Sequence, residues 1–176
     1  AGHTGFKGSW LCKWLNHLGA EVFGYSLNPS TEPNHFDLSN PKVSSHINNI
    51  QDFNSVRDFI TKSEPEIIFH LAAQPLVIES YKEPLETFTT NVIGTANILE
   101  AARYVDTVKA VIIITTDKCY KNKECIYGYR ETDELGGYDP YSASKACTEL
   151  VTESYKNSFF KEENTGLLIA SARAGN

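Results

Sequence analysis

The stretch AGHTGFKGSW, residues 1–10, decides how this chain folds. Its glycines, Gly2, Gly5 and Gly8, are three residues apart and lead into a run that alternates apolar and polar positions like a helix. Glycines at such a turn let the backbone bend sharply and let a pyrophosphate approach the amides at the positive end of the helix. The spacing Gly-x-x-Gly-x-x-Gly differs from Gly-x-Gly-x-x-Gly, and alone it fits an ordinary glycine-rich turn equally well.

Downstream of this loop, helix-like and strand-like segments alternate. We expect helices over 9–18, 52–63, 84–104 and 141–162, and strands over 21–27, 45–50, 67–72, 109–116 and 167–172. Several of the strands are apolar on both faces, which is typical of a parallel sheet covered by helices on both sides. The predicted fold class is therefore α/β, a doubly wound parallel sheet of the Rossmann type. We expect Trp10 and Trp14, one turn apart, to pack the first helix against this sheet.

The glycine loop of such a fold follows the first strand, which lies in the centre of the sheet. The sequence starts at Ala1, inside the loop motif, and contains no methionine. We therefore expect residues 1–176 to be one partial dinucleotide-binding domain without its first strand. The sheet is then expected to have an open central slot with unpaired edges on both sides.

Charge and composition limit the possible partners. The net charge of -6 and the pI near 5.4 argue against nucleic acid and anionic membranes, which bind clustered Lys and Arg. The apolar run Ala110–Ile114 is too short to span a bilayer, and the N-terminus has no signal-peptide layout. The four cysteines form no Cys-x-x-Cys pair and have no His at ligand spacing, so we expect reduced thiols and no metal. A cytoplasmic protein with a small-molecule partner is predicted.

Tyr141 and Lys145 are one helical turn apart, so their side chains project from the same face. A tyrosine with a pKa of about 10 is a poor base, but a neighbouring ammonium and a bound nicotinium cation favour its phenolate. Such a pair takes the proton of an alcohol while hydride leaves for a dinucleotide. Chance pairing on a solvated helix face is the alternative. The glycine loop and the strand ending in Thr115 and Thr116 favour the redox pair.

Four motifs together resemble one family. They are GHTGFKGSW at 2–10, HLAAQ at 70–74, TTDK at 115–118 and DPYSASK at 139–145. Along essentially the whole chain they resemble the extended short-chain dehydrogenases/reductases that modify nucleotide sugars, the NAD-dependent epimerase/dehydratase family. Within it the likeness is greatest to the dehydratases of CDP-glucose. The resemblance also implies that the C-terminal substrate region of such enzymes is absent from this sequence.

The resemblance implies a hydro-lyase that converts CDP-glucose to CDP-4-keto-6-deoxyglucose by C4 oxidation, water elimination across C5/C6 and hydride return to C6. Tyr141, with Lys145 and Thr116, would take the C4 hydroxyl proton. Asp117 would protonate the departing C6 hydroxyl, and we expect partial burial to raise its pKa. Lys118 stands where related dTDP-glucose enzymes have Glu. It would be the C5 base, if burial depresses its pKa, or an electrostatic partner of the enolate, or a solvated surface lysine.

The same resemblance assigns the cofactor and substrate contacts. NAD would contact Gly2, Thr4, Gly5, Phe6, Gly8, Asn49, Ile50, Leu71, Ala72, Ala73, Asn91, Tyr141 and Lys145, and substrate would contact Thr116 and Asn176. Asn91 would support the Tyr141/Lys145 pair or simply pack its helix. Neither an acidic residue nor an arginine follows the second strand, where Tyr25–Asn28 stands, which favours NAD over NADP. The full-length protein is expected to be a homo-oligomer.

Two other functions remain open. The first is another nucleotide-sugar enzyme of this family, an epimerase or a dehydratase for a different nucleotide. Asp117 argues against the epimerase, because epimerases of this family usually lack a carboxylate at that position. The second is a non-catalytic NAD-binding module, against which the presence of Thr116, Tyr141 and Lys145 together argues.

Overall fold

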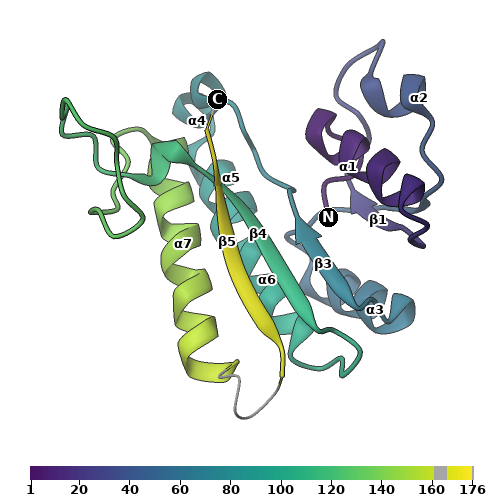
Figure 1. Ribbon diagram of the computed structural model, residues 1–176. Helices are drawn as coiled ribbons and strands as arrows, with labels where there is room; N and C mark the ends of the chain where they lie inside the picture. Colours follow the sequence, from purple (N-terminus) through teal and green to yellow (C-terminus); the bar gives the residue numbers. More distant parts are fainter. Residues whose placement is uncertain (161–165, 176) are drawn as a thin grey trace.

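A computed structural model describes residues 1–160 and 166–175 of the chain and shows an α/β fold with parallel strands (Figure 1). One sheet pairs β1 (Phe23–Ser26) with β2 (Ser44–Ile47). The other contains β3 (Ile67–His70), β4 (Ala110–Thr116) and β5 (Leu168–Ala174), with β4 in the middle. All of these pairs are parallel, which confirms the predicted α/β class with parallel strands.

Helices connect the strands. They are α1 (Phe6–His17), α2 (His35–Ser39), α3 (Phe53–Ser63), α4 (Val77–Lys82), α5 (Pro84–Phe88), α6 (Gly94–Ala102) and α7 (Pro140–Phe159), with a π-helical turn η1 (Thr89–Ile93) and a 3-10 turn η2 (Asp117–Cys119). Figure 1 shows α6 and α7 side by side behind the three-stranded sheet, where both contact β4. Leu99 of α6 and Val111 and Ile113 of β4 are fully buried in the core between these elements.

A gap separates the two sheets between β1 and β3. Ala1 and Gly2 lie in it: the Gly2 N–H donates to the Tyr25 carbonyl at 2.8 Å, and the Leu71 N–H donates to the Ala1 carbonyl at 2.9 Å. Beside these two residues lies a cavity of about 640 Å³, lined by side chains from α1, β1, α3 and β3. Among the described residues the two sheets are therefore not paired with each other, and this cavity lies between β1 and β3.

Side-chain caps set where two of the helices begin. The Asp52 carboxylate accepts a hydrogen bond from the Ser55 N–H at 3.1 Å, and α3 begins at the next residue, Phe53. Asp139 accepts in the same way from the Ser142 N–H at 3.0 Å, and Pro140 stands at the first position of α7. Each cap contributes about 1 kcal/mol to its helix. Both helix starts agree to within one residue with the starts predicted from the sequence.

Two expectations about helices were wrong. The segment 84–104 is not one helix, because the π-helical turn η1 interrupts it between α5 and α6. The segment between the strands expected over 21–27 and 45–50, where no helix was expected, contains α2, which begins where the Asn34 side chain accepts a hydrogen bond from the Asp37 N–H at 2.9 Å. At α2 this local side-chain contact outweighs the general sequence pattern.

The two tryptophans of α1 do not pack against a sheet. Trp10 and Trp14 are 56% and 64% exposed, because α1 buries the face that carries Gly8, Ser9 and Cys12 instead. Trp10 stacks on His35 with ring centroids 4.7 Å apart. Among residues 1–160 and 166–175, no helix has the length and apolar character that crossing a membrane requires.

Candidate functional site

A cavity of about 790 Å³ follows the carboxyl ends of the strands, from the glycine loop to α7. Its lining includes most of the residues predicted to contact a dinucleotide: Gly2, Thr4, Gly5, Phe6, Gly8, Asn49, Ile50, Leu71, Ala72, Ala73, Tyr141 and Lys145. Ligands of open α/β sheets bind at this edge of the sheet. No Asp or Glu is among the described residues that line the cavity, so it suits an anionic ligand.

The glycines of the loop have different neighbours. A Cβ on Gly8 would lie 2.0 Å from the Gly2 carbonyl oxygen, and one on Gly2, which has φ +88°, would lie 2.6 Å from the Ala72 nitrogen. Both glycines are therefore required by close backbone packing. A Cβ on Gly5 would lie 3.5 Å from its nearest neighbour, so packing does not require a glycine there. Gly5 caps α1 without a side-chain hydrogen bond, which leaves the first-turn amides open to a ligand.

Polar contacts hold the loop at the ends of β1 and β2. The Thr4 hydroxyl donates to the Leu27 carbonyl at 2.8 Å and lies 2.8 Å from the Ser26 hydroxyl. The Asn49 side-chain carbonyl accepts from the Gln51 N–H at 3.0 Å, and the backbone carbonyl of Asn49 accepts from the Tyr25 hydroxyl. These bonds place the end of the glycine loop and the segment after β2 on the same side of the cavity.

Tyr141 and Lys145 lie at the other end of the cavity, and both are buried. The Lys145 ammonium donates to the Ile114 carbonyl of β4 at 3.1 Å. Burial lowers the pKa of Lys145 from 10.5 to about 8, and the charge of Glu149 opposes this shift. Burial also raises the pKa of Tyr141 above 10, an effect that contact with Thr116 only partly offsets. The expected shift toward phenolate, which depends on the ammonium together with a bound nicotinium cation, therefore stays a prediction.

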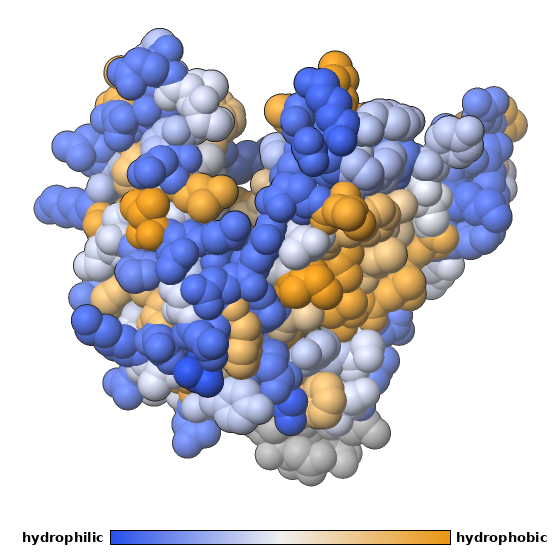
Figure 2. All heavy atoms as spheres, turned by 180° about the vertical axis from the view of Figure 1, so that it is seen from behind, coloured by the Kyte–Doolittle hydropathy of each residue, from blue (hydrophilic) through white to orange (hydrophobic). Residues whose placement is uncertain are grey.

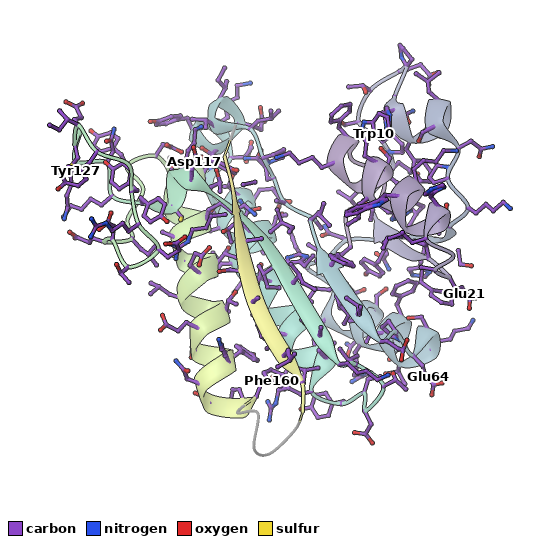
Figure 3. All side chains as sticks on the ribbon, in the orientation of Figure 1. Trp10, Glu21, Glu64, Asp117, Tyr127 and Phe160 are labelled. Carbon is purple, nitrogen blue, oxygen red and sulfur yellow. The ribbon has the colours of Figure 1, made fainter. Side chains whose placement is uncertain are left out.

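Asp117 and Lys118 form the turn η2 directly after β4, and Figure 3 shows Asp117 at the end of that strand, far from Phe160. The buried Thr116 hydroxyl donates to the Asp117 carboxylate at 3.0 Å and accepts from the Lys118 N–H at 3.3 Å. Asp117 and Lys118 themselves are exposed, and neither lines the cavity. The partial burial expected for Asp117 was wrong, since the turn follows the strand end into solvent. For Lys118 this exposure disfavours only the alternative of a base whose pKa burial depresses.

Asn91 is buried behind the cavity rather than in its lining. Its side-chain carbonyl accepts from the Gln74 N–H at 2.8 Å, and its amide donates to the Gln74 carbonyl at 3.1 Å and to the Ser144 hydroxyl at 2.8 Å. Because Ser144 stands next to Lys145 on α7, Asn91 holds the helix that carries the Tyr141/Lys145 pair. Asn176, the other predicted substrate contact, lies outside the residues that the structure describes.

The sequence pattern pointed to Tyr25–Asn28 only as a segment without a charged residue and named no contacts in the segment after β1. The structure adds Ser26, Asn28, Ser30, Thr31, Asn34 and His35 to the cavity lining. His35 is half-buried, and its ring nitrogen lies 2.6 Å from the Ser9 hydroxyl. The rule that ligands bind at the carboxyl ends of the strands could have indicated this segment.

Known proteins were compared with the chain. The sequence model of the GDP-mannose 4,6 dehydratase family matches residues 1–169. CDP-glucose 4,6-dehydratase of Salmonella typhimurium is 52% identical over 180 residues, which cover 99% of this chain and 50% of that enzyme. CDP-paratose 2-epimerase of Salmonella typhi is 29% identical, with 90% of this chain and 52% of that enzyme covered. The chain thus spans about half the length of the curated relatives it matches.

Solved structures agree with this result. UDP-glucose 4-epimerase of Thermotoga maritima, solved with UDP-glucose, superimposes with a TM-score of 0.83 at 26% identity over 98% of this chain and 53% of that chain. UDP-glucose 4-epimerase of Brucella ovis, solved in complex with NAD, has a TM-score of 0.83 at 26% identity over 99% of this chain and 50% of that chain. With its fold shared by these enzymes and residues 1–169 matched by the family model, the chain belongs to the GDP-mannose 4,6 dehydratase family.

Proposed function

We propose that residues 1–176 are the dinucleotide-binding part of a nucleotide-sugar 4,6-dehydratase that acts on CDP-glucose. One observation carries the proposal: the Tyr141/Lys145 pair lines one end of a cavity whose other end is the glycine loop, and the turn η2 with Asp117 and Lys118 contacts the helix that carries this pair. A redox pair and an acid beside it are what a dehydratase needs. The 52% identity to the CDP-glucose enzyme supports the choice of nucleotide.

The residues of the cavity fit NAD. Its volume is sufficient, its lining contains no carboxylate among the described residues, and Gly5 leaves the first turn of α1 free for a pyrophosphate. The small side chains of Ala72 and Ala73 after β3 allow a close approach. When bound, NAD supplies the acceptor for a hydride from C4 and returns that hydride to C6.

Tyr141 is the base for the C4 hydroxyl in this proposal. Its oxygen, as the phenolate, takes the proton and becomes the phenol, and the Thr116 hydroxyl orients the C4 oxygen. Since burial raises the pKa of Tyr141, the phenolate needs a positive charge close by. Lys145, with a pKa of about 8, carries that charge at neutral pH and is held in place by the Ile114 carbonyl.

Asp117 is the acid that protonates the departing C6 hydroxyl. Its exposed position lets a sugar reach it, and a sugar that covers the turn would exclude water from its carboxyl. Lys118, beside it, either takes the C5 proton or stabilises the enolate by its charge. The first role needs the neutral amine and the second needs the ammonium, and the exposed side chain at this turn is open to the sugar in either form.

The test is turnover by the full-length protein with CDP-glucose and NAD. We expect a 4-keto sugar, detected by its absorbance in base, without accumulation of NADH. Asp117→Asn should block dehydration and spare C4 oxidation. Asp58→Asn, which changes an exposed carboxylate on α3, should affect neither step. Net NADH formation or a preference for dTDP-glucose would contradict the proposed function, and full turnover by Asp117→Asn would contradict the proposed role of Asp117.

We also propose that the full-length protein pairs with a second copy through an apolar surface on α4, α5, η1 and α7. Figure 2 shows apolar side chains gathered on this side of the molecule. The exposed apolar residues of these elements are Ile78, Tyr81, Leu85, Ile93 and Leu150. An exposed patch of this kind commonly marks an interface. Light scattering should give a dimer or larger species that Leu85→Glu dissociates, and a monomeric parent protein would refute this interface.

A further inference from the structure

Glu149 is a buried carboxylate that the proposed reaction does not use. It lies on α7 one turn after Lys145 and two turns after Tyr141, so these residues share one face of the helix. Its side chain is in the core, and the residue is 6% exposed. A carboxylate in such a place is costly unless donors surround it.

Three donors from two strands surround Glu149. The Thr115 hydroxyl of β4 donates to one carboxylate oxygen. The other oxygen accepts from the Ser171 hydroxyl at 2.8 Å and from the Arg173 guanidinium at 3.1 Å, both on β5. Glu149 therefore joins α7 to β4 and β5 at the residue that precedes Thr116.

Arg173 extends this network to the segment after η2. Its second amino group donates to the Tyr120 hydroxyl at 2.8 Å and to the Glu131 carbonyl at 3.0 Å. The guanidinium carbon also lies 4.8 Å from the centroid of the Tyr120 ring. Tyr120 directly follows η2, so the partner of Glu149 also holds the chain that leaves the turn with Asp117 and Lys118.

Few of the titratable groups around Lys145 carry a charge at neutral pH. His70 on β3 and Cys119 in η2 are uncharged at neutral pH, because burial lowers the pKa of His70 well below 6.5 and raises the pKa of Cys119 to about 11. Burial acts against ionised Glu149, but the donors, Arg173 first, hold its pKa below the usual 4.5. Tyr141 is neutral, Asp117 is exposed at the surface, and Arg173 is paired with Glu149. Glu149 is thus the buried negative charge that acts on Lys145.

We propose that Glu149 is a positioning residue: its carboxylate keeps Lys145 in the ammonium form beside Tyr141 and, through Thr115 and Arg173, fixes the end of β4 and the segment after η2. The charge effect on Lys145 belongs to the fold and stands without any substrate. The consequence for turnover rests on the proposed function.

The test compares Glu149→Gln with the parent protein by NMR titration of lysine labelled with carbon-13 at Cε, the Lys145 signal being assigned with Lys145→Arg. Removing the carboxylate should lower the pKa of Lys145 by about one unit. The alkaline limb of kcat against pH should move to lower pH by the same amount, because less ammonium remains at a given pH. An unchanged Lys145 titration would overturn the proposal.

Control variants separate charge from packing. Glu149→Asp keeps the charge and should retain the parent titration of Lys145, even where it loses a hydrogen bond. Glu153→Gln removes an exposed carboxylate one turn further along α7 and should change neither readout. A Glu149→Asp variant that titrates like Glu149→Gln would show that packing, not charge, is responsible, and so would overturn the proposal.

A second variant covers the case in which Glu149→Gln fails to fold, since breaking a buried pair leaves Arg173 without its partner. Glu149→Gln/Arg173→Met removes both charges together and should still lower the Lys145 pKa, but by less than Glu149→Gln, because losing the more distant Arg173 cation partly offsets losing the carboxylate. No shift in this variant would also overturn the proposal. Absence of turnover by the parent protein with CDP-glucose would refute the proposed function and leave the lysine titration as an independent result.

Discussion

At the scale of single residues, Gly5 and Gly8 show that two glycines of one loop serve different purposes. The bare Cα of Gly8 lets α1 begin against the Gly2 carbonyl, whereas the bare Cα of Gly5 keeps space open in front of the helix. The spacing of the glycines in the sequence does not distinguish Gly5 from Gly8. Substitution by alanine separates them, because one change affects folding and the other affects the ligand.

We predict opposite effects for the two alanine variants. Gly8→Ala should lower the free energy of unfolding by more than about 2 kcal/mol, because its Cβ overlaps a backbone oxygen. Gly5→Ala has an ordinary backbone conformation, with φ -72° and ψ 162°, and should change stability by less than about 1 kcal/mol. It should nevertheless weaken NAD about tenfold, or by about 1.4 kcal/mol. Urea unfolding measures the stability of each variant, and calorimetric titration measures its affinity for NAD. Unchanged NAD binding by Gly5→Ala would remove the loop from the proposed site.

Lys145 gives a prediction that depends on pH. Its pKa is depressed to about 8 in the folded chain, so the ammonium destabilises the fold below that pH. Lys145→Met should therefore raise the free energy of unfolding at neutral pH by about 2 kcal/mol while abolishing turnover. The difference from the parent should shrink as the pH rises from about 8 toward the ordinary value of 10.5.

Exposed Lys156, on the same helix, provides the control for this experiment. Lys156→Met should change stability by no more than about 0.5 kcal/mol at any pH in the range. A Lys145→Met variant that is less stable than the parent at neutral pH would show that the hydrogen bond to Ile114 outweighs the cost of burying the charge.

At the scale of elements, the π-helical turn η1 puts Asn91 where it joins the segment after β3 to α7. Asn91→Ala leaves the N–H and carbonyl of Gln74 and the Ser144 hydroxyl without this partner. We predict a loss of about 3 kcal/mol in the free energy of unfolding, measured in urea. Asn54→Ala, exposed on α3, is the control and should cost less than about 1 kcal/mol.

Helix starts were predictable from sequence where a cap is local. Asp52 and Asp139 stand one residue before their helices and bond to amides three residues further on, so both sides of the contact are visible in the sequence. Asn91 and Glu149 are different, because their partners are distant in sequence: Ser144 for one, Arg173 for the other. The interruption of the helix at η1 and the network around Glu149 therefore could not be read from local patterns.

At the scale of the whole molecule, the order of parallel strands could be predicted because helix and strand patterns alternate along the chain. The Tyr141/Lys145 pair could also be predicted from the sequence, because both residues lie on one helix. The exposure of Asp117 could not be predicted, because it depends on how the long segment after β4 turns away from the sheet (Figure 3). Tertiary packing decides that turn, and hence also how much of the site is open to a sugar.

The central position of β4 has a consequence for the dynamics of the molecule. Of the strands that the structure describes, only β4 pairs with a neighbouring strand along both edges, while β2 is exposed along its length. We expect the amide protons of 110–116 to exchange at least about tenfold more slowly than those of 23–26 and 44–47, measured by deuterium uptake. Equal rates would contradict this. On warming, the glycine loop should loosen first, so the protein should release its dinucleotide while the Tyr141/Lys145 end still keeps its shape.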